Sequence, residues 1–226
     1  MNRRLQAIAA LVPDGLGMID VGTDHGYLPV SLLRNGYRGK VFASDIREGP
    51  LNAALRTAEK AGLAECISFQ LCDGLALCDP EQVDCIVIAG MGGDTVCGIL
   101  DRAEWCMDRR YTLVLQPMTR PEVLRYWLAY NEFEIEREEL VEDDGILYPI
   151  LVARFGGKTM LNDAELFTGS ARMLKEHPLF PLLLEQQIRR FEKTRDGLAG
   201  AGKNSRPERK KLVEEILSQM KEMKQG

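Results

Sequence analysis

The chain has 226 residues, of which 45% are hydrophobic and 28% charged. This length and composition allow the hydrophobic core of one or two domains, and they exclude a disordered chain and a small protein held together by disulfides. Its net charge of -5 excludes a uniformly basic nucleic-acid coat, so any nucleic-acid site must be local. The sequence has six cysteines without a CxxC motif and only two histidines, which predicts free thiols in the cytoplasm and no metal site. Since no apolar run approaches the ~20 residues of a membrane span, no membrane anchor is expected.

The charge is unevenly distributed along the chain. Residues 1–152 contain 14 Lys and Arg against 24 Asp and Glu, whereas residues 153–226 contain 15 against 10. This asymmetry suggests an acidic catalytic body and a basic arm with an anionic partner. A merely solvated helical surface explains the basic part equally well.

A helix is expected over residues 3–12, because apolar residues recur there at helical spacing and Pro13-Asp14-Gly15 ends the pattern. Short apolar runs then alternate with helical segments such as residues 50–61. Because these runs lack polar alternation, they indicate a parallel sheet covered by helices on both faces, with ligands at the carboxyl ends of its strands. The expected strands are residues 18–21, 40–44, 67–71, 85–89 and 112–115.

The first expected strand ends in a loop, DVGTDHGYLP, that runs from Asp20 to Pro29. Its glycines permit a tight turn, and the free amides at the next helix start favour electronegative groups. A dinucleotide-binding loop would need glycine where Asp24 stands, because a pyrophosphate must lie against bare amides. The Asp24 carboxylate instead suits S-adenosylmethionine, which carries an ammonium and a sulfonium but no phosphate. A structural turn with solvated carboxylates is the alternative.

Two further carboxylates follow the second and third strands. Asp45 comes about 20 residues after the loop, where an acid can accept both ribose hydroxyls. Asp73 follows the third strand and is expected beside the exocyclic amine of adenine. Each could instead be a helix cap or a turn residue. Together, the three acids after successive strands predict a nucleoside cleft.

The fourth and fifth strands are expected to end in loops at the reacting end of that cleft. Gly90-Met91-Gly92-Gly93 would leave backbone exposed beside the transferable methyl group. In Gln116-Pro117-Met118 the proline would stiffen the loop, and the Gln116 amide could hydrogen-bond a flat heterocycle. A helix-opening glycine turn and a strand-end proline are the alternative interpretations.

The remaining residues predict a hairpin and a helical tail. Residues 133–141 and 146–155 are strand-like and joined by a turn at 142–145, which indicates an antiparallel hairpin that closes the sheet. Since Pro149 cannot donate a ladder hydrogen bond, its strand should be an edge or contain a local break.

Beyond Gly157 the pattern is helical, and a glycine-rich segment at 197–207 predicts a turn between two helices. They are expected to form a hairpin or coiled-coil arm, with two core helices of a small cap as the alternative. The apolar stripes are Leu184, Ile188, Phe191 and Leu198 on one helix, and Leu212, Val213, Ile216, Leu217, Met220 and Met223 on the other. The predicted domains are residues 1–156 and 157–226.

Five motifs occur in a fixed order: GTDHGYLP, ASDI followed by Gly49-Pro50, CDGL, IAGMGG and LQPM. In this combination the chain resembles the bacterial TrmK family of tRNA (adenine-N1)-methyltransferases, over most of residues 1–155. Two positions depart from the family pattern: Gly26 stands where alanine is expected, and Tyr148-Pro149-Ile150 replaces a YEI-like triplet.

The resemblance implies an α/β fold, with a Rossmann-like seven-stranded class I methyltransferase sheet and a C-terminal α-helical coiled-coil domain that helps to hold tRNA. It implies S-adenosylmethionine-dependent methylation of N1 of the adenine at position 22 in tRNA. The alternatives are a methyltransferase of a small molecule or protein, and a noncatalytic RNA-binding module. The residues expected to bind the cofactor are Asp20, Gly22, Thr23, Asp24, His25, Tyr27, Leu28, Asp45, Ile46, Asp73, Gly74, Gly90 and Met91.

Methyl transfer to adenine N1 needs alignment more than a base, because N1 already carries a lone pair. Asp24 or Asp94 would favour the cationic product, and His25 is a candidate proton shuttle. The positioning residues expected are Gly90, Met91, Gly92, Gln116, Pro117 and Met118. Contacts to tRNA are expected from Gly92, Gly93, Gln116, Arg189, Arg190, Lys193, Arg206 and Lys210, and the helical arm is a candidate homodimer surface.

Overall fold

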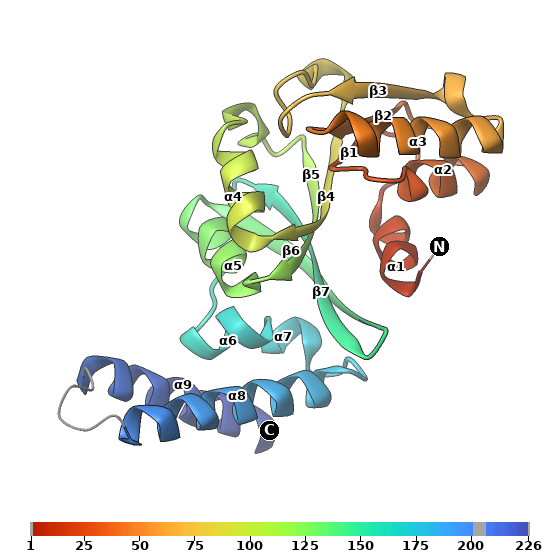
Figure 1. The fold of residues 1–226 in the computed structure, drawn as a ribbon. Coiled ribbons are helices and arrows are strands. Elements are labelled where there is room, and N and C mark those ends of the chain that lie inside the picture. Colours follow the sequence, from red (N-terminus) through yellow and green to blue (C-terminus); the bar gives the residue numbers. More distant parts are fainter. Residues whose placement is uncertain (1, 201–206, 226) are drawn as a thin grey trace. The chain divides into compact units, whose positions relative to one another are not determined.

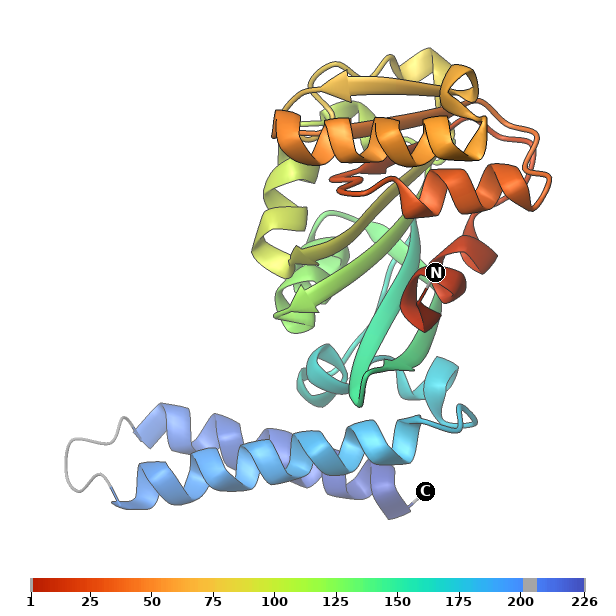
Figure 2. The ribbon, with the colours of Figure 1, turned by 45° about the vertical axis from the view of Figure 1, so that its right-hand side comes forward.

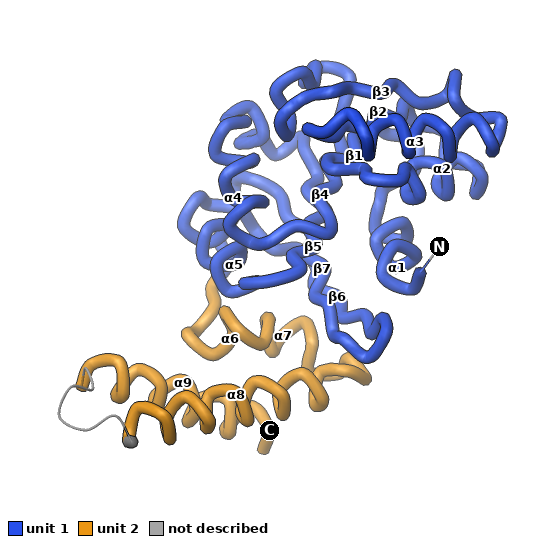
Figure 3. The backbone as a smooth tube through the Cα atoms, in the orientation of Figure 1, with its two compact units in different colours: residues 1–159 blue, residues 160–226 orange. Residues whose placement is uncertain are grey.

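The computed structural model describes residues 2–200 and 207–225. Its contacts divide the chain into two compact units, Met1–Thr159 and Met160–Gly226 (Figure 3). Thr159 belongs to the first unit because its hydroxyl oxygen accepts a hydrogen bond from the amide of Ile135, at 2.6 Å, and donates one to the carbonyl of Phe133.

The first unit contains a seven-stranded sheet in the order β3-β2-β1-β4-β5-β7-β6 (Figure 1). The first five strands are parallel, and β7 runs antiparallel to both β5 and β6. This confirms the predicted sheet and its closing hairpin. The strands are β1 (Met18–Val21), β2 (Val41–Asp45), β3 (Ile67–Leu71), β4 (Cys85–Gly92), β5 (Thr112–Thr119), β6 (Phe133–Asp143) and β7 (Ile146–Phe155).

Helices cover both faces of this sheet (Figures 1 and 2). On one face α1 (Arg3–Leu11), α2 (Tyr27–Arg34) and α3 (Glu48–Ala61) pack in succession, and on the other α4 (Gly93–Asp101) packs beside α5 (Pro121–Tyr130). Short 3-10 turns lie at Ala64–Cys66, Pro80–Gln82 and Glu104–Cys106. The core joins apolar side chains of the first three helices to inward residues of the strands, among them Ile8, Leu28, Met18 and Val87.

Two strands are longer than the sequence pattern predicts. Beyond Ala89 and Leu115, β4 and β5 remain paired as far as Gly92 and Thr119, with irregular register around Met91. Gly90 has a φ of +82°, which allows this irregularity because glycine adopts positive φ without steric cost. Met91, Gly92, Gln116 and Pro117 therefore lie in paired strands and not in open loops, so that part of the prediction is wrong, whereas Gly93 begins α4.

Pro149 of the hairpin was expected in an edge strand or at a local break. β7 is an inner strand, so the first alternative is excluded, and its pairing with β5 stops before Pro149, in agreement with the second. The β5–β7 pairs run from Leu113–Ala153 to Leu115–Leu151, whereas Pro149 lies opposite Leu140 of β6. The missing amide donor thus falls where β7 is paired on one side only.

The second unit is helical and consists of α6 (Asp163–Thr168), α7 (Ala171–Leu174), α8 (Phe180–Gly200) and α9 (Pro207–Gln225). α8 and α9 lie side by side (Figures 1 and 2). Asn162 and Glu165 form a capping box that begins α6. The buried residues of the two long helices include Leu184, Ile188, Phe191, Val213, Ile216, Leu217 and Met220.

One position of the predicted apolar stripes lies outside the buried face. Leu212 is 46% exposed, whereas Leu198 and Met223 are half-buried at the margins of the stripes. Residues 197–200 continue α8 instead of turning, because helical hydrogen bonding tolerates Gly197 near a helix end. The rest of the predicted turn, residues 201–206, lies outside the described residues. In the described part of the chain we find no helix both long and apolar enough to cross a membrane.

Candidate active site

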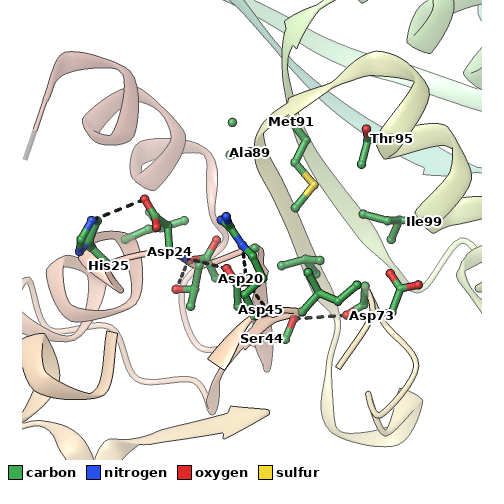
Figure 4. A pocket seen from close by; sticks show the side chains of 18 of the residues that line it. Asp20, Asp24, His25, Ser44, Asp45, Asp73, Ala89, Met91, Thr95 and Ile99 are labelled. Carbon is green, nitrogen blue, oxygen red and sulfur yellow. Dashed lines mark hydrogen bonds and ion pairs between the residues drawn. The ribbon is translucent and has the colours of Figure 1, made fainter. Parts of the chain in front are cut away.

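The carboxyl ends of β1, β2, β3 and β4 border a cleft of about 750 Å³ (Figure 4). This volume suits a small-molecule ligand. Every residue expected from the sequence to bind the cofactor lies on the cleft wall: Asp20, Gly22, Thr23, Asp24, His25, Tyr27, Leu28, Asp45, Ile46, Asp73, Gly74, Gly90 and Met91. The structure thus brings these residues together, and their roles stay predictions.

The loop after β1 is held by hydrogen bonds to buried carboxylates. Thr23 Oγ1 donates to Asp20 Oδ2 at 2.7 Å, and burial raises the pKa of Asp20 to about 6. The Asp24 amide donates to Asp45 Oδ2 at 3.4 Å, with Asp24 itself at a φ of +52°. Asp24 is thereby turned so that its carboxylate stays exposed on the cleft wall.

Two glycines of this loop have left-handed backbone conformations. Gly22 has a φ of +72°, which favours glycine, and the nearest atom to a Cβ there would be the methyl end of the flexible Met91 side chain, which points from β4 toward the cleft (Figure 4). A Cβ on Gly26 would lie 2.9 Å from the Cβ of Ala54 in α3, and Gly26 has a φ of +69°. The glycine at position 26, a departure from the family pattern, therefore matches the tight contact between α2 and α3.

The carboxylates that follow β2 and β3 are held differently. Asp45 is buried, and its Oδ1 accepts a hydrogen bond from the Arg47 amide at 2.9 Å. Asp73 is exposed and forms an ion pair of 3.0 Å with Arg102, at the end of α4. Asp45 is thus a fixed acceptor, whereas Asp73 can adjust to a ligand.

Gln116 is fully buried at the β5 end, and its amide is engaged within the protein. Its Oε1 accepts hydrogen bonds from the Gly90 amide at 3.2 Å and from Arg4 Nη1 at 2.5 Å, while its Nε2 donates to the Pro117 carbonyl at 2.8 Å. Gly92, Gln116, Pro117 and Met118, expected at the reacting end, do not belong to the residues that line the cleft.

The start of α4 forms the opposite wall. Asp94 lines the cleft, and its two carboxylate oxygens accept hydrogen bonds from Arg120 Nη1 at 2.7 and 2.8 Å. Gly93 lies outside the cleft lining, where a Cβ would be 2.3 Å from the Arg120 carbonyl oxygen. Gly93 therefore permits close packing of α4 against the start of α5. His25 stacks on Tyr27, with its Nε2 3.8 Å from Asp24 Oδ2.

Several cleft residues were not predicted from the sequence. Arg4 reaches the cleft from α1, and its guanidinium lies 5.6 Å from the ring centroid of Tyr148. Arg102, Thr95 and Ile99 come from α4 and its end. Arg4 occurs in an amphipathic helix outside every motif, so the sequence offered no signal beyond its position on that helix.

The basic residues expected to contact tRNA belong to the second unit. Arg189 pairs with Glu185 at 2.8 Å, and Lys210 with Glu214 at 3.9 Å. Two further cations of α8 were expected to contact tRNA: Arg190 donates to Gln187 and lies 6.0 Å from the Phe167 ring centroid, while Lys193 is exposed. Arg206 lies outside the described residues.

Comparison with known proteins adds independent findings. A family model described as a methyltransferase domain matches residues 1–151. The tRNA (adenine(22)-N(1))-methyltransferase of Bacillus subtilis (strain 168) is 35% identical over 163 residues, which are 72% of this chain and 68% of that protein.

Solved structures agree over nearly the whole chain. The crystal structure of the B. subtilis tRNA methyltransferase TrmK matches with a TM-score of 0.88 at 29% identity, covering 99% of this chain and 98% of that one. A Streptococcus pneumoniae protein crystallised with S-adenosyl-L-methionine matches with a TM-score of 0.81 at 30% identity, covering 99% of each chain. With the fold, the cleft and the motif order in agreement, the chain belongs to the TrmK family of tRNA (adenine(22)-N(1))-methyltransferases.

Proposed function

We propose that this protein transfers the methyl group of S-adenosylmethionine to N1 of adenine 22 in tRNA. The observation that carries the proposal is the cleft itself, in which Asp24, Asp45 and Asp73 lie at the carboxyl ends of three adjacent strands in a chain of this family. Bound S-adenosylmethionine supplies an electrophilic methyl group on a positively charged sulfur. The residues on the cleft wall fit this molecule, because carboxylates face a ligand that carries an ammonium and a sulfonium.

Each acid has a distinct part in holding the cofactor. Asp45 is fixed by two backbone amides and accepts the ribose hydroxyls, whereas the exposed Asp73 accepts from the adenine amine. Asp20 and Asp24 place negative charge near the ammonium. Gly22, at a φ of +72°, has no Cβ, so its backbone is open to the ligand.

The chemical step depends on positioning. Adenine N1 attacks with its own lone pair, so alignment, worth roughly 7–11 kcal/mol, outweighs a general base, worth ~3–5 kcal/mol. Gly90 and Met91 form the wall beside the transferred methyl group. The carboxylates of Asp24 and Asp94 favour the positive charge that appears on the methylated base.

The helical unit supplies tRNA contacts in this proposal. N1 lies on the pairing edge of adenine, so the base must be exposed at a cost of a few kcal/mol, which phosphate contacts must offset. Arg189, Arg190, Lys193 and Lys210 are exposed cations of that unit. We also propose that the protein forms a homodimer through the same helices. We further propose a cytoplasmic location, with which the six free cysteines are consistent.

The proposal is tested with purified protein, methyl-labelled S-adenosylmethionine and unmodified bacterial tRNA. A methyl group on N1 blocks base pairing, so we expect reverse transcription to stop at position 22. A matched tRNA with guanine at that position should accept no label. Methylation elsewhere would contradict the assigned site, transfer without tRNA would favour a small-molecule or protein substrate, and tRNA binding without transfer would favour a noncatalytic module.

A further inference from the structure

We propose that Arg4 of α1 binds the carboxylate of the methionine end of S-adenosylmethionine. This inference rests on the proposed function, because it assumes that the cleft holds this cofactor. It assigns a role to a residue outside all five sequence motifs.

Three arginines line the cleft, and two of them are paired with its carboxylates. Arg47 Nε lies 3.9 Å from Asp45 Oδ1, and Arg102 Nη2 lies 3.0 Å from Asp73 Oδ1. Among the described residues, Arg4 instead contacts uncharged groups, the Gln116 amide oxygen and the ring of Tyr148. Its positive charge is therefore available to a negatively charged ligand.

The guanidinium of Arg4 is held against the end of β4. The Gln116 oxygen that accepts from Arg4 also accepts from the Gly90 amide, which ties both groups to one buried side chain. A Cβ on Gly90 would lie 3.5 Å from Arg4 Nη1, so the guanidinium lies beside bare backbone. Gln116 uses one of five guanidinium N–H groups, and the others can donate to a planar, bidentate acceptor.

The order of the strand ends identifies that acceptor. Asp73 and Asp45 place the adenine and ribose over β3 and β2, so the amino-acid end of the cofactor lies over β1 and β4. That end carries an ammonium and a carboxylate. Asp20 and Asp24 suit the ammonium but repel the carboxylate, and Arg4 is the unneutralised cation at the same end. A guanidinium fork matches a carboxylate in shape and charge.

Calorimetry with a matched ligand pair tests the assignment. S-adenosylhomocysteine carries the carboxylate, whereas its decarboxylated form, S-adenosyl-3-thiopropylamine, keeps the ammonium and lacks it. For Arg4→Gln we expect S-adenosylhomocysteine to bind about 10- to 100-fold more weakly and the decarboxylated ligand to bind as it does to the wild type. Arg4→Lys should recover part of the loss.

Arg3→Gln is the matched control, because Arg3 is exposed on the same helix and does not line the cleft. It should bind both ligands normally, and thermal unfolding checks that each variant is folded. Equal weakening of both ligands by Arg4→Gln, or no weakening of either, would overturn the inference. Weaker tRNA binding with unchanged S-adenosylhomocysteine binding would assign Arg4 to a phosphate instead. Failure of the wild type to bind S-adenosylhomocysteine would overturn the cofactor assignment itself.

Discussion

Both units of this chain contain exposed ion pairs, but the first unit also contains a buried one, whereas the pairs along α8 and α9 are exposed. In residues 1–159, Arg125 of α5 and Glu138 of β6 form a fully buried pair, with 3.1 Å between Nε and Oε1. In residues 160–226, Lys211 and Glu215 pair across one turn of α9 at 3.5 Å, with side chains 79% and 52% exposed. Buried charges fix geometry and tolerate little change, whereas exposed charges create a field that salt can screen.

This difference matches the division of tasks that we propose. A cofactor with several functional groups needs acceptors at fixed positions, and the first unit provides buried acids at strand ends. A tRNA backbone repeats one charged group, so it can be attracted by exposed cations without exact geometry.

Breaking the buried pair should give the largest loss of stability. We expect Arg125→Met to lower the free energy of unfolding by about 3–5 kcal/mol, because it removes the guanidinium that pairs with the buried carboxylate of Glu138. Urea denaturation followed by circular dichroism measures this. Replacing Glu138 by Leu in the same variant should recover much of the loss. A loss below about 1 kcal/mol would place this pair in the same class as the exposed ones.

Asp20 should make the stability of the first unit depend on pH. Burial raises the pKa of Asp20 from 3.8 to about 6, so the folded state keeps a proton that the unfolded state releases. Its contribution to stability is therefore present below pH ~4 and is lost as pH rises to ~6, by up to about 3 kcal/mol. The stability difference between wild type and Asp20→Asn, measured by denaturation from pH 4 to 7, should fall accordingly. A constant difference would contradict the raised pKa.

Removing the fixed ribose acceptor should affect the cofactor and spare tRNA binding. We expect Asp45→Ala to weaken S-adenosylmethionine binding by about 1.5–3 kcal/mol, because a charged acceptor is lost. Calorimetry on the folded variant measures it. Since Asp45 also accepts from the amides of Asp24 and Arg47, Asp45→Asn is the control that keeps one side-chain acceptor. Unchanged cofactor affinity would reduce Asp45 to a structural turn residue.

The exposed pair of the second unit should matter least for stability. We expect Lys211→Gln to lower the free energy of unfolding by about 0.3–0.5 kcal/mol, the usual value for a helical pair four residues apart. The same urea titration applies. A loss comparable to that of Arg125→Met would remove the distinction between the two units.

Local patterns predicted most of the first unit. Apolar runs identified every strand, and the acids at their ends were placed on one cleft, because parallel strands bring their carboxyl ends to the same edge. The extensions of β4 and β5 were missed, since a proline and three glycines indicate loops locally, and only pairing between strands keeps them in the sheet.

Long-range contacts account for the rest. The hydrogen bond between Arg4 and Gln116 joins residues 112 positions apart, so it cannot be predicted from the pattern of residues within one helix. The short helices α6 and α7 were also not predicted, because few apolar residues repeat within 163–168 and 171–174. The spacing of Leu212 matches the apolar stripe of its helix, yet its side chain is 46% exposed. Spacing alone does not show which residues of a stripe are covered by other parts of the protein.

The proposed division between a cofactor-binding unit and a tRNA-binding unit is tested most directly by salt dependence. Wild type and a triple variant, Arg189→Gln with Arg190→Gln and Lys193→Gln, are compared for tRNA affinity over a range of salt concentrations and for S-adenosylhomocysteine affinity. If these cations contact phosphates, the slope of log affinity against log salt should fall by about two to three units, with cofactor affinity unchanged. An unchanged slope and normal tRNA affinity would contradict the account and move tRNA recognition to the first unit.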